Sequence, residues 1–130
     1  PWYTGRPTGF TQRSHVNFCV FDGTWESTEE YEIDHNPKVA AWVKNDHLGF
    51  EIPYIFQGVR RKYRPDFLIR LVSGKMLVLE VKGQDSQENK TKREFLDQWV
   101  KAVNGHGGFG DWEWAVSYRP REIADILEKL

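Results

Sequence analysis

Two carboxylates and an amine lie near the ends of two predicted strands in the middle of the chain. Asp66 follows Pro65 and begins an apolar run, and Glu80 and Lys82 end a second apolar run, MLVLEVK. Carboxylates are hard oxygen ligands that Mg²⁺ takes in small numbers, with water and phosphate oxygens completing its coordination. A cation held in this way lowers the pKa of bound water and stabilises charge on a scissile phosphate. Because the Lys82 ammonium offsets further negative charge, the three residue types suit metal-assisted phosphodiester hydrolysis.

Whether these three side chains can meet depends on how the two strands pair. Side chains alternate between the faces of a strand, so Glu80 and Lys82 share one face of MLVLEVK, and Asp66 points away from Phe67. The residues on the opposite, apolar faces are Phe67, Ile69, Leu71, Leu77, Leu79 and Val81. If both apolar faces pack on one core layer, the residue numbers of any two directly opposed residues must add up to an even number. This predicts a loop of three or five residues, or a bulge, at Ser73-Gly74, because a two-residue loop puts Asp66 on the wrong face.

Each of these charges also has a purely structural interpretation. Glu80 and Lys82 can be solvated residues at the edge of a sheet, and Asp66 after Pro65 can cap the start of a strand. The hypothesis of a site rests on co-occurrence, because Asp66 and Glu80 lie 14 positions apart across one predicted hairpin. Three interpretations stay open: a metal-dependent nuclease, a non-catalytic DNA-binding or docking module, and a structural domain with solvated strand-end charges.

The composition fits one folded domain in 130 residues with a net charge of −1. Hydrophobic residues make up 39% and aromatic residues 15%, which argues against a disordered chain, and no long apolar run indicates a membrane span. The single cysteine, Cys19, excludes a disulfide framework, and we expect it to be buried in a strand. Because the sequence begins at Pro1, we expect a fragment of a longer protein, with 1–14 as a linker and 15–130 as one domain.

The first part of the domain is predicted to hold one strand and two helices. The β-rich segment His15–Phe21 favours a strand, and the Glu-rich segment Trp25–Asp34 favours a helix. Asn36 as N-cap and Pro37 at the first helical position predict a second, short helix that ends near Lys44.

The rest of the chain is predicted to be strands interrupted by one long helix. Residues 50–56 form a strand, a turn follows at Gln57-Gly58, and the next strand leads into the hairpin around Ser73-Gly74. A helix is expected from about Lys90 to Asn104, then a strand over 111–118 and a last helix. The apolar stripes of the two helices are Phe95, Leu96, Trp99, Val100 and Val103, and Ile123, Ile126, Leu127 and Leu130. The order β-α-α-β-β-β-α-β-α predicts an α/β or α+β domain built on one mixed sheet.

The chain shows a resemblance to a nuclease superfamily that is carried by Pro65-Asp66 and Glu80-Val81-Lys82. These residues resemble the signature of the PD-(D/E)xK, or restriction-endonuclease-like, nucleases. Over about residues 14–118 the chain is most similar to the C-terminal nuclease domain of type III restriction enzyme Res subunits and related helicase-linked nucleases. The ordered segments that carry this similarity are SHVNFCVFDGTWE, VAAWVKNDHLGFEIPY, YRPDFLIRL, LVLEVKG and WVKAVN. The resemblance implies a restriction-endonuclease-like mixed sheet flanked by helices, and a Mg²⁺-dependent DNA endonuclease in which Mn²⁺ can substitute.

The same resemblance implies roles for individual residues. Asp66, Glu80 and the Val81 carbonyl would bind the metal, and Lys82 would be the catalytic lysine. The upstream helical acid of the family falls on Glu26. Its near competitors are Glu29, Glu30 and Glu32. Gln84, just past the strand end, is expected either to contact the site or to be an ordinary loop residue.

Basic residues on both sides of the site suggest how DNA would be bound. The candidates for phosphate contact are Arg60, Arg61, Lys62 and Arg64 before Asp66, and Lys90 and Lys92 after the site. Solvated surface cations are the alternative. As partners the resemblance implies DNA, a helicase or translocase ATPase domain of the same polypeptide, and a modification methyltransferase subunit. It also implies a prokaryotic cytoplasmic protein, and we expect no association with a membrane.

Overall fold

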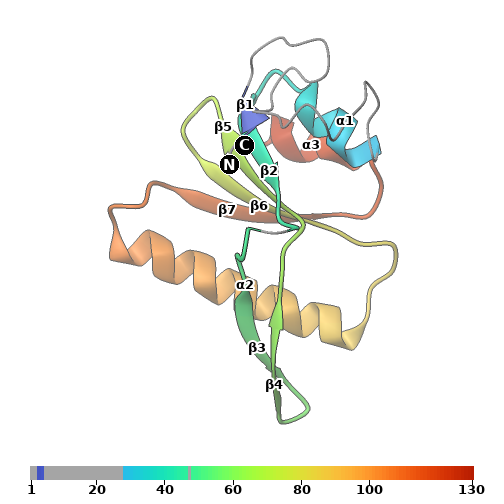
Figure 1. Ribbon diagram of the computed structural model, residues 1–130, viewed down its shortest axis with the longest axis vertical. Coiled ribbons are helices and arrows are strands. Elements are labelled where there is room, and N and C mark those ends of the chain that lie inside the picture. Colours follow the sequence, from blue (N-terminus) through green and yellow to red (C-terminus); the bar gives the residue numbers. More distant parts are fainter. Residues whose placement is uncertain (1–2, 5–27, 47) are drawn as a thin grey trace.

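A mixed five-stranded sheet, three helices and a separate hairpin make up the part of the chain that the structure describes (Figure 1). The structure is a computed structural model that describes residues 3–4, 28–46 and 48–130. The strands are β1 (Tyr3–Thr4), β2 (Val39–Lys44), β3 (Ile52–Phe56), β4 (Val59–Tyr63), β5 (Phe67–Leu71), β6 (Met76–Val81) and β7 (Trp112–Ser117). The helices are α1 (Thr28–Asp34), α2 (Gln87–His106) and α3 (Glu122–Glu128). The chain is therefore a mixed α+β domain, in agreement with the predicted class.

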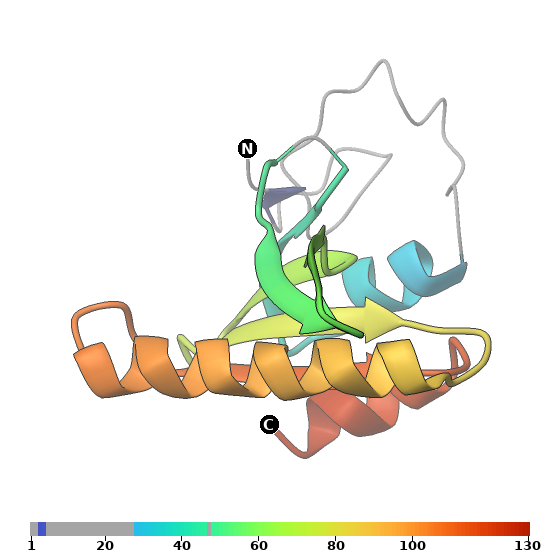
Figure 2. The same cartoon turned by 90° about the horizontal axis from the view of Figure 1, so that it is seen from below.

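The five-stranded sheet has the order β1-β2-β5-β6-β7. The pairs β1–β2, β2–β5 and β5–β6 are antiparallel, whereas β6 and β7 are parallel. A parallel pair needs a long crossover connection, and α2 supplies it between β6 and β7. Figure 2 shows α2 stretched lengthwise along the strands. The strands β5 and β6, which carry the predicted site, thus lie inside the sheet and not at its edge.

The two faces of the sheet are covered by different helices. We call one the α1/α3 face; its buried residues include Ile33 from α1 and Ile123 and Leu127 from α3. The strand residues on this face are Val39, Trp42, Phe67, Ile69, Leu71, Leu77 and Leu79. The other, the α2 face, packs Leu96 and Val100 of α2 over Val43, Leu68 and Val78 of the sheet. The apolar faces of β5 and β6 pack in one layer, as predicted from their alternation.

The hairpin β3–β4 forms an arm outside the main sheet and packs on α2. Ile52, Tyr54 and Tyr63 join the hydrophobic cluster of the α2 face. The turn of the hairpin is at Gln57 (φ 50°) and Gly58 (φ 77°), two residues with positive φ as a type I′ turn requires. Figure 1 shows the arm crossing α2 and ending beyond it. The prediction of one continuous run from this turn into the site is wrong, because the chain changes sheets between β4 and β5.

The predicted helix from Asn36 to Lys44 is wrong, because this segment contains the strand β2. Asn36 does act as a cap, but its side chain accepts the Lys38 N–H (2.9 Å) in a turn that leads into the strand. β2 lies between β1 and β5, and Val39, Trp42 and Val43 are buried on both of its faces. A strand buried on both faces shows no alternation, so its short apolar run cannot be distinguished from a buried helix.

The other predicted elements agree with the structure to within a few residues. Helix α2 begins at Gln87 rather than Lys90, because the Ser86 hydroxyl accepts the Asn89 N–H (3.0 Å) and caps it. The stripes of α2 and α3 face the sheet as predicted. In the predicted linker, Tyr3–Thr4 pairs with β2. The predicted strand at 15–21, Cys19 and the start of the first helix fall outside the described residues.

Candidate functional site

Asp66 and Glu80 lie side by side where β5 begins and β6 ends. The β5–β6 register pairs Phe67 with Leu79 and Arg70 with Met76, so opposed residues have numbers of even sum. Leu71 closes the hairpin by donating its N–H to the Lys75 carbonyl (2.9 Å) across a three-residue loop. The prediction of an odd-numbered loop is confirmed. Continued by one position, this register sets Asp66 opposite Glu80 in a non-hydrogen-bonded pair, where side chains lie closest.

Pro65 interrupts the ladder beside these acids. In the same register Pro65 faces Val81, but proline has no N–H and cannot donate to the Val81 carbonyl. The Pro65 carbonyl accepts from the Asn45 side chain (2.9 Å), and the Asp66 carboxylate accepts the Val81 N–H instead (2.7 Å). The N–H and C=O of one strand residue point to the same edge, so the Val81 carbonyl is also directed toward Asp66.

Lys82 lies on the same side as Glu80. Its ammonium is 3.0 Å from the Glu80 carboxylate, whose side chain is only 3% exposed, whereas the Lys82 side chain is 23% exposed. Beyond β6, the Lys82 N–H donates to the Ser117 carbonyl (2.9 Å), which holds this residue in line with β7. The structure therefore brings Asp66, Glu80 and Lys82 together, as the face analysis predicted.

The surroundings of the two acids favour their protonated forms. Burial raises the pKa of Asp66, although the hydrogen bond from Val81 and the charge of Lys82 oppose the shift. Burial is also the main cause of the raised pKa of Glu80, followed by the negative charge of Asp66. One buried and one half-buried carboxylate that repel one another are a costly arrangement, and a bound cation relieves both the repulsion and the desolvation.

The donor set suits a hard divalent cation that keeps several waters. Two carboxylates and the Val81 carbonyl are oxygen ligands of the type that Mg²⁺ binds. Among the described residues, no further acid, histidine or cysteine completes a cluster of three. The remaining positions of an octahedron would then belong to water and to a phosphate oxygen. This set fits Mg²⁺ better than Zn²⁺, which takes mostly nitrogen and sulfur ligands.

The upstream acid predicted at Glu26 falls outside the described residues. Of its competitors, Glu30 is buried (1% exposed), whereas Glu29 and Glu32 are partly exposed. Glu30 pairs with Lys44 (3.3 Å), and the charge of Lys44 acts on the Asp66 carboxylate. Lys44 lies opposite Phe67, on the α1/α3 face, so this ion pair connects Glu30 to the strand end where Asp66 lies.

The predicted DNA-binding residues divide into two groups. Arg60, Arg61 and Lys62 belong to β4, and Arg64 follows it; all four are exposed. Arg61 approaches Glu88 (3.9 Å), and Arg64 approaches Glu51 (3.4 Å). Along the arm, a groove of about 760 Å³ is lined by Pro53, Tyr54, Ile55, Arg60, Arg61, Lys62 and Phe95. This groove does not include Asp66, Glu80 or Lys82, so a long ligand would have to extend from it to reach the acids.

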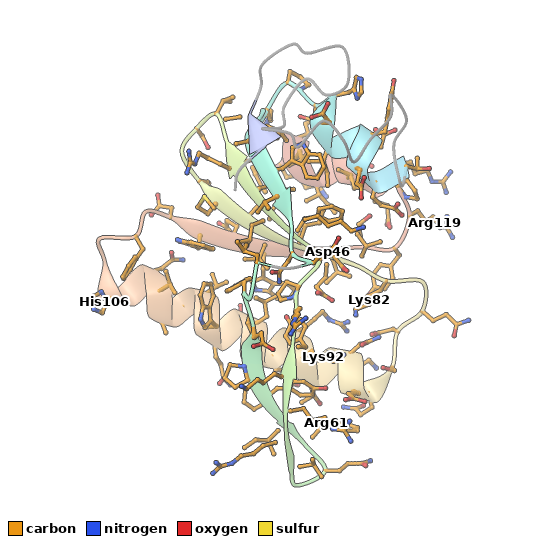
Figure 3. All side chains as sticks on the ribbon, viewed as in Figure 1. Asp46, Arg61, Lys82, Lys92, His106 and Arg119 are labelled. Atoms are coloured by element: carbon orange, nitrogen blue, oxygen red, sulfur yellow. The ribbon has the colours of Figure 1, made fainter. Side chains whose placement is uncertain are left out.

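Lys92 and Lys90 belong to the first part of α2. Lys92 Nζ lies 5.6 Å from the ring centroids of both Tyr54 and Tyr63, and its charge acts on Glu80. Lys90 is exposed. Figure 3 shows Lys82, Lys92 and Arg61 following one another from the end of β6 toward the arm. Gln84 is exposed in the loop before α2, and its carbonyl accepts from Asn89 (3.3 Å).

Two residues near the site were missed by sequence reasoning, Tyr63 and Lys44. In RRKYR, Tyr63 is the one aromatic residue, and alternation along a strand would have placed it on the face opposite Lys62 and Arg64. Lys44 was missed because its segment was predicted as a helix.

Comparison with protein-family models, curated proteins and solved structures finds no significant match for this chain. The resemblance to PD-(D/E)xK nucleases therefore stays a prediction. No helix among the described residues has both the length and the apolar character needed to cross a membrane.

Proposed function

We propose that this chain is a Mg²⁺-dependent endonuclease domain that hydrolyses phosphodiester bonds in DNA. One observation carries the proposal: the carboxylates of half-buried Asp66 and buried Glu80 face each other at strand ends, with the Lys82 ammonium 3.0 Å from Glu80. The finer proposals are a restriction-endonuclease-like fold and a role as cleavage module of a type III Res subunit. Its partners would be a helicase or translocase ATPase domain of the same polypeptide and a modification methyltransferase, in a prokaryotic cytoplasm.

In this proposal the chain's own residues bind, orient and neutralise charge. Asp66, Glu80 and the Val81 carbonyl would hold the metal, which supplies Lewis acidity toward water and phosphate. The side-chain nitrogen of Lys82 lies 3.0 Å from the Glu80 carboxylate and would stabilise negative charge on the phosphate as it is attacked. The Val81 N–H fixes one oxygen of Asp66, so the orientation of that carboxylate is set before a metal binds.

The arm and the start of α2 would bind the DNA backbone. Arg60 and Lys62 lie on one face of β4, two residues apart, and Arg61 lies on the other face beside the groove. Ammonium and guanidinium groups contact phosphates without reading base sequence, so this surface would supply position and affinity. Lys92 connects it to the acids, because its charge acts on Glu80.

The test compares plasmid cleavage by the wild-type chain with cleavage by Asp66→Ala and Lys82→Ala, with Mg²⁺ and with EDTA. We expect metal-dependent cutting that each substitution lowers about 100-fold or more. Lys101→Ala is the matched control, because Lys101 is an exposed lysine (76%) paired with Asp97 far along α2. Cutting that both site variants retain would contradict the assignment of this site.

Titration calorimetry with Mn²⁺ tests the metal site without relying on activity. The wild-type chain and Lys101→Ala should bind Mn²⁺, and Asp66→Ala should not.

A non-catalytic DNA-binding module is the second candidate, favoured by the exposed cations of the arm, which lie apart from the acids. It predicts DNA binding that EDTA leaves unchanged, together with no binding of Mn²⁺.

A further inference from the structure

Tyr63 ends the strand of the arm that is nearest to the acids. It pairs with Ile52 and is only 6% exposed, whereas Lys62 and Arg64 on either side are exposed. Its ring packs in the cluster of the α2 face and meets the Tyr54 ring edge-on, with centroids 6.0 Å apart. The strand therefore presents its cations to solvent and this aromatic residue to the interior.

The hydroxyl of Tyr63 is buried and has no hydrogen-bond partner among the described residues. Buried hydroxyls in folded proteins nearly always have a hydrogen-bond partner, either a protein group or an ordered water, so this hydroxyl calls for a partner that the described residues do not supply. Tyr54 shows the contrast, because its hydroxyl donates to the Glu88 carboxylate (2.6 Å).

Tyr63 packs beside the two acids: its ring belongs to one cluster with Leu68 and Val78, which share the α2 face with Asp66 and Glu80 and lie two residues from them. After burial, the strongest influences that raise the pKa of Tyr63 are the negative charges of Glu80 and Asp66. The hydroxyl consequently stays protonated at neutral pH, so it can donate a hydrogen bond to an acceptor. Lys92 Nζ lies 5.6 Å from the centroid of the Tyr63 ring.

We propose that Tyr63 is a positioning residue whose hydroxyl donates a hydrogen bond to a water held between Asp66 and Glu80 together with the divalent cation. The inference deepens the proposed function and rests on its metal site. A donor fixed by the arm would orient that water and favour cation binding. Because the arm also carries the cations that line the groove, Tyr63 would link DNA binding at the arm to cation binding at Asp66 and Glu80.

The experiment uses Tyr63→Phe, which removes one oxygen and keeps the ring, with Tyr54→Phe as the matched control from the same cluster. Calorimetry with Mn²⁺ in the absence of DNA is the main measurement. We expect Tyr63→Phe to weaken Mn²⁺ binding about 10- to 100-fold, as loss of a partner that orients a metal's ligand does, while Tyr54→Phe binds as the wild type. Melting without metal is measured alongside, and Tyr63→Phe should be at least as stable as the wild type because it loses an unpaired group.

Three results would overturn the inference. Unchanged Mn²⁺ affinity in Tyr63→Phe, with wild-type binding intact, contradicts the role of Tyr63 and leaves the proposed function standing. Reduced DNA affinity with unchanged Mn²⁺ affinity would show that the hydroxyl contacts a phosphate instead. A large loss of stability without metal would show that the hydroxyl has a structural partner. By contrast, a wild-type chain that neither binds Mn²⁺ nor cuts DNA contradicts the proposed function itself.

Discussion

The two faces of the central sheet differ most where β5 begins and β6 ends. On the α1/α3 face Phe67 and Leu79 lie in one continuous core with α1 and α3, and Lys44, a strand-end charge on this face, is paired with Glu30. On the α2 face the apolar residues Leu68 and Val78 are followed by Asp66 and Glu80. Both faces bury acidic residues, but the α2 face sets two carboxylates opposite each other, whereas Glu30 on the α1/α3 side faces a lysine. At this end the α2 face gives up apolar contacts for two carboxylates whose charged forms their surroundings disfavour.

The largest change in the free energy of unfolding is expected for a substitution on the α1/α3 face. Leu77 is fully buried there, so Leu77→Ala should lower the free energy of unfolding by about 2–5 kcal/mol through lost contacts and a cavity. Urea denaturation at neutral pH measures this change. Leu48→Ala is the control, because Leu48 is 42% exposed and its loss should cost no more than about 0.5 kcal/mol. Equal costs at the two positions would mean that this face is not the main core.

The opposite sign is expected on the α2 face. Glu80→Gln removes a buried charge that its surroundings disfavour, so it should raise the free energy of unfolding at pH 7 by roughly 0.5–2 kcal/mol. The same denaturation measurement, without added metal, decides the sign. A clear loss of stability would show that the pairing of Glu80 with Lys82 outweighs the burial cost, and the contrast between the two faces would disappear.

The pH dependence sharpens that result. The pKa of Glu80 is raised in the folded state, so the chain takes up a proton on folding at pH values near and above the ordinary carboxyl pKa of about 4.3. The wild-type chain should therefore lose stability as pH rises from that value through the raised pKa, and Glu80→Gln should lose less. Cleavage should follow the reverse course and fail as pH falls into the same range, since protonated acids do not bind a cation.

The smallest effect is expected at the exposed pair Asp97–Lys101 of α2 (2.8 Å). Lys101→Ala should cost about 0.2–0.5 kcal/mol, as exposed helical ion pairs do. Here Lys101 lowers the pKa of Asp97, so the pair's contribution is present at neutral pH and is lost as pH falls through the lowered pKa. Thermal melts at low and high salt measure it, because salt screens the attraction between two exposed charges. If Glu80→Gln altered the salt dependence of stability more than Lys101→Ala does, the result would contradict the burial of Glu80.

The site was more predictable than the sheet around it. Alternation in the β5–β6 hairpin is a local property, so the sequence could indicate both the odd loop and the meeting of Asp66 with Glu80. The strand β2 could not be predicted in this way, because burial on both faces removes the alternation that distinguishes a strand. With β2 predicted as a helix, the pairing of Lys44 with Glu30 was also out of reach.

The unpaired hydroxyl of Tyr63 illustrates a second limit. Its burial follows from the arm packing on α2, two segments that are distant in sequence and lie side by side only in the folded chain. Local patterns indicate which residues point inward, but they do not show whether a hydroxyl finds an acceptor. Satisfaction of a polar group is a property of the assembled structure.

The three-residue loop between β5 and β6 has a consequence for the order in which the chain folds. Closing a short loop costs little chain entropy, so a local hairpin can form within microseconds. The parallel pairing of β6 with β7 must wait for the 20-residue helix α2 to cross the sheet. We therefore expect the strand register that opposes Asp66 and Glu80 to be established early, before either helical layer covers it. Asp66 and Glu80 would then be set opposite each other while both carboxylates are still hydrated. They would lose their hydration only in the last steps of folding, when the helices pack on the sheet.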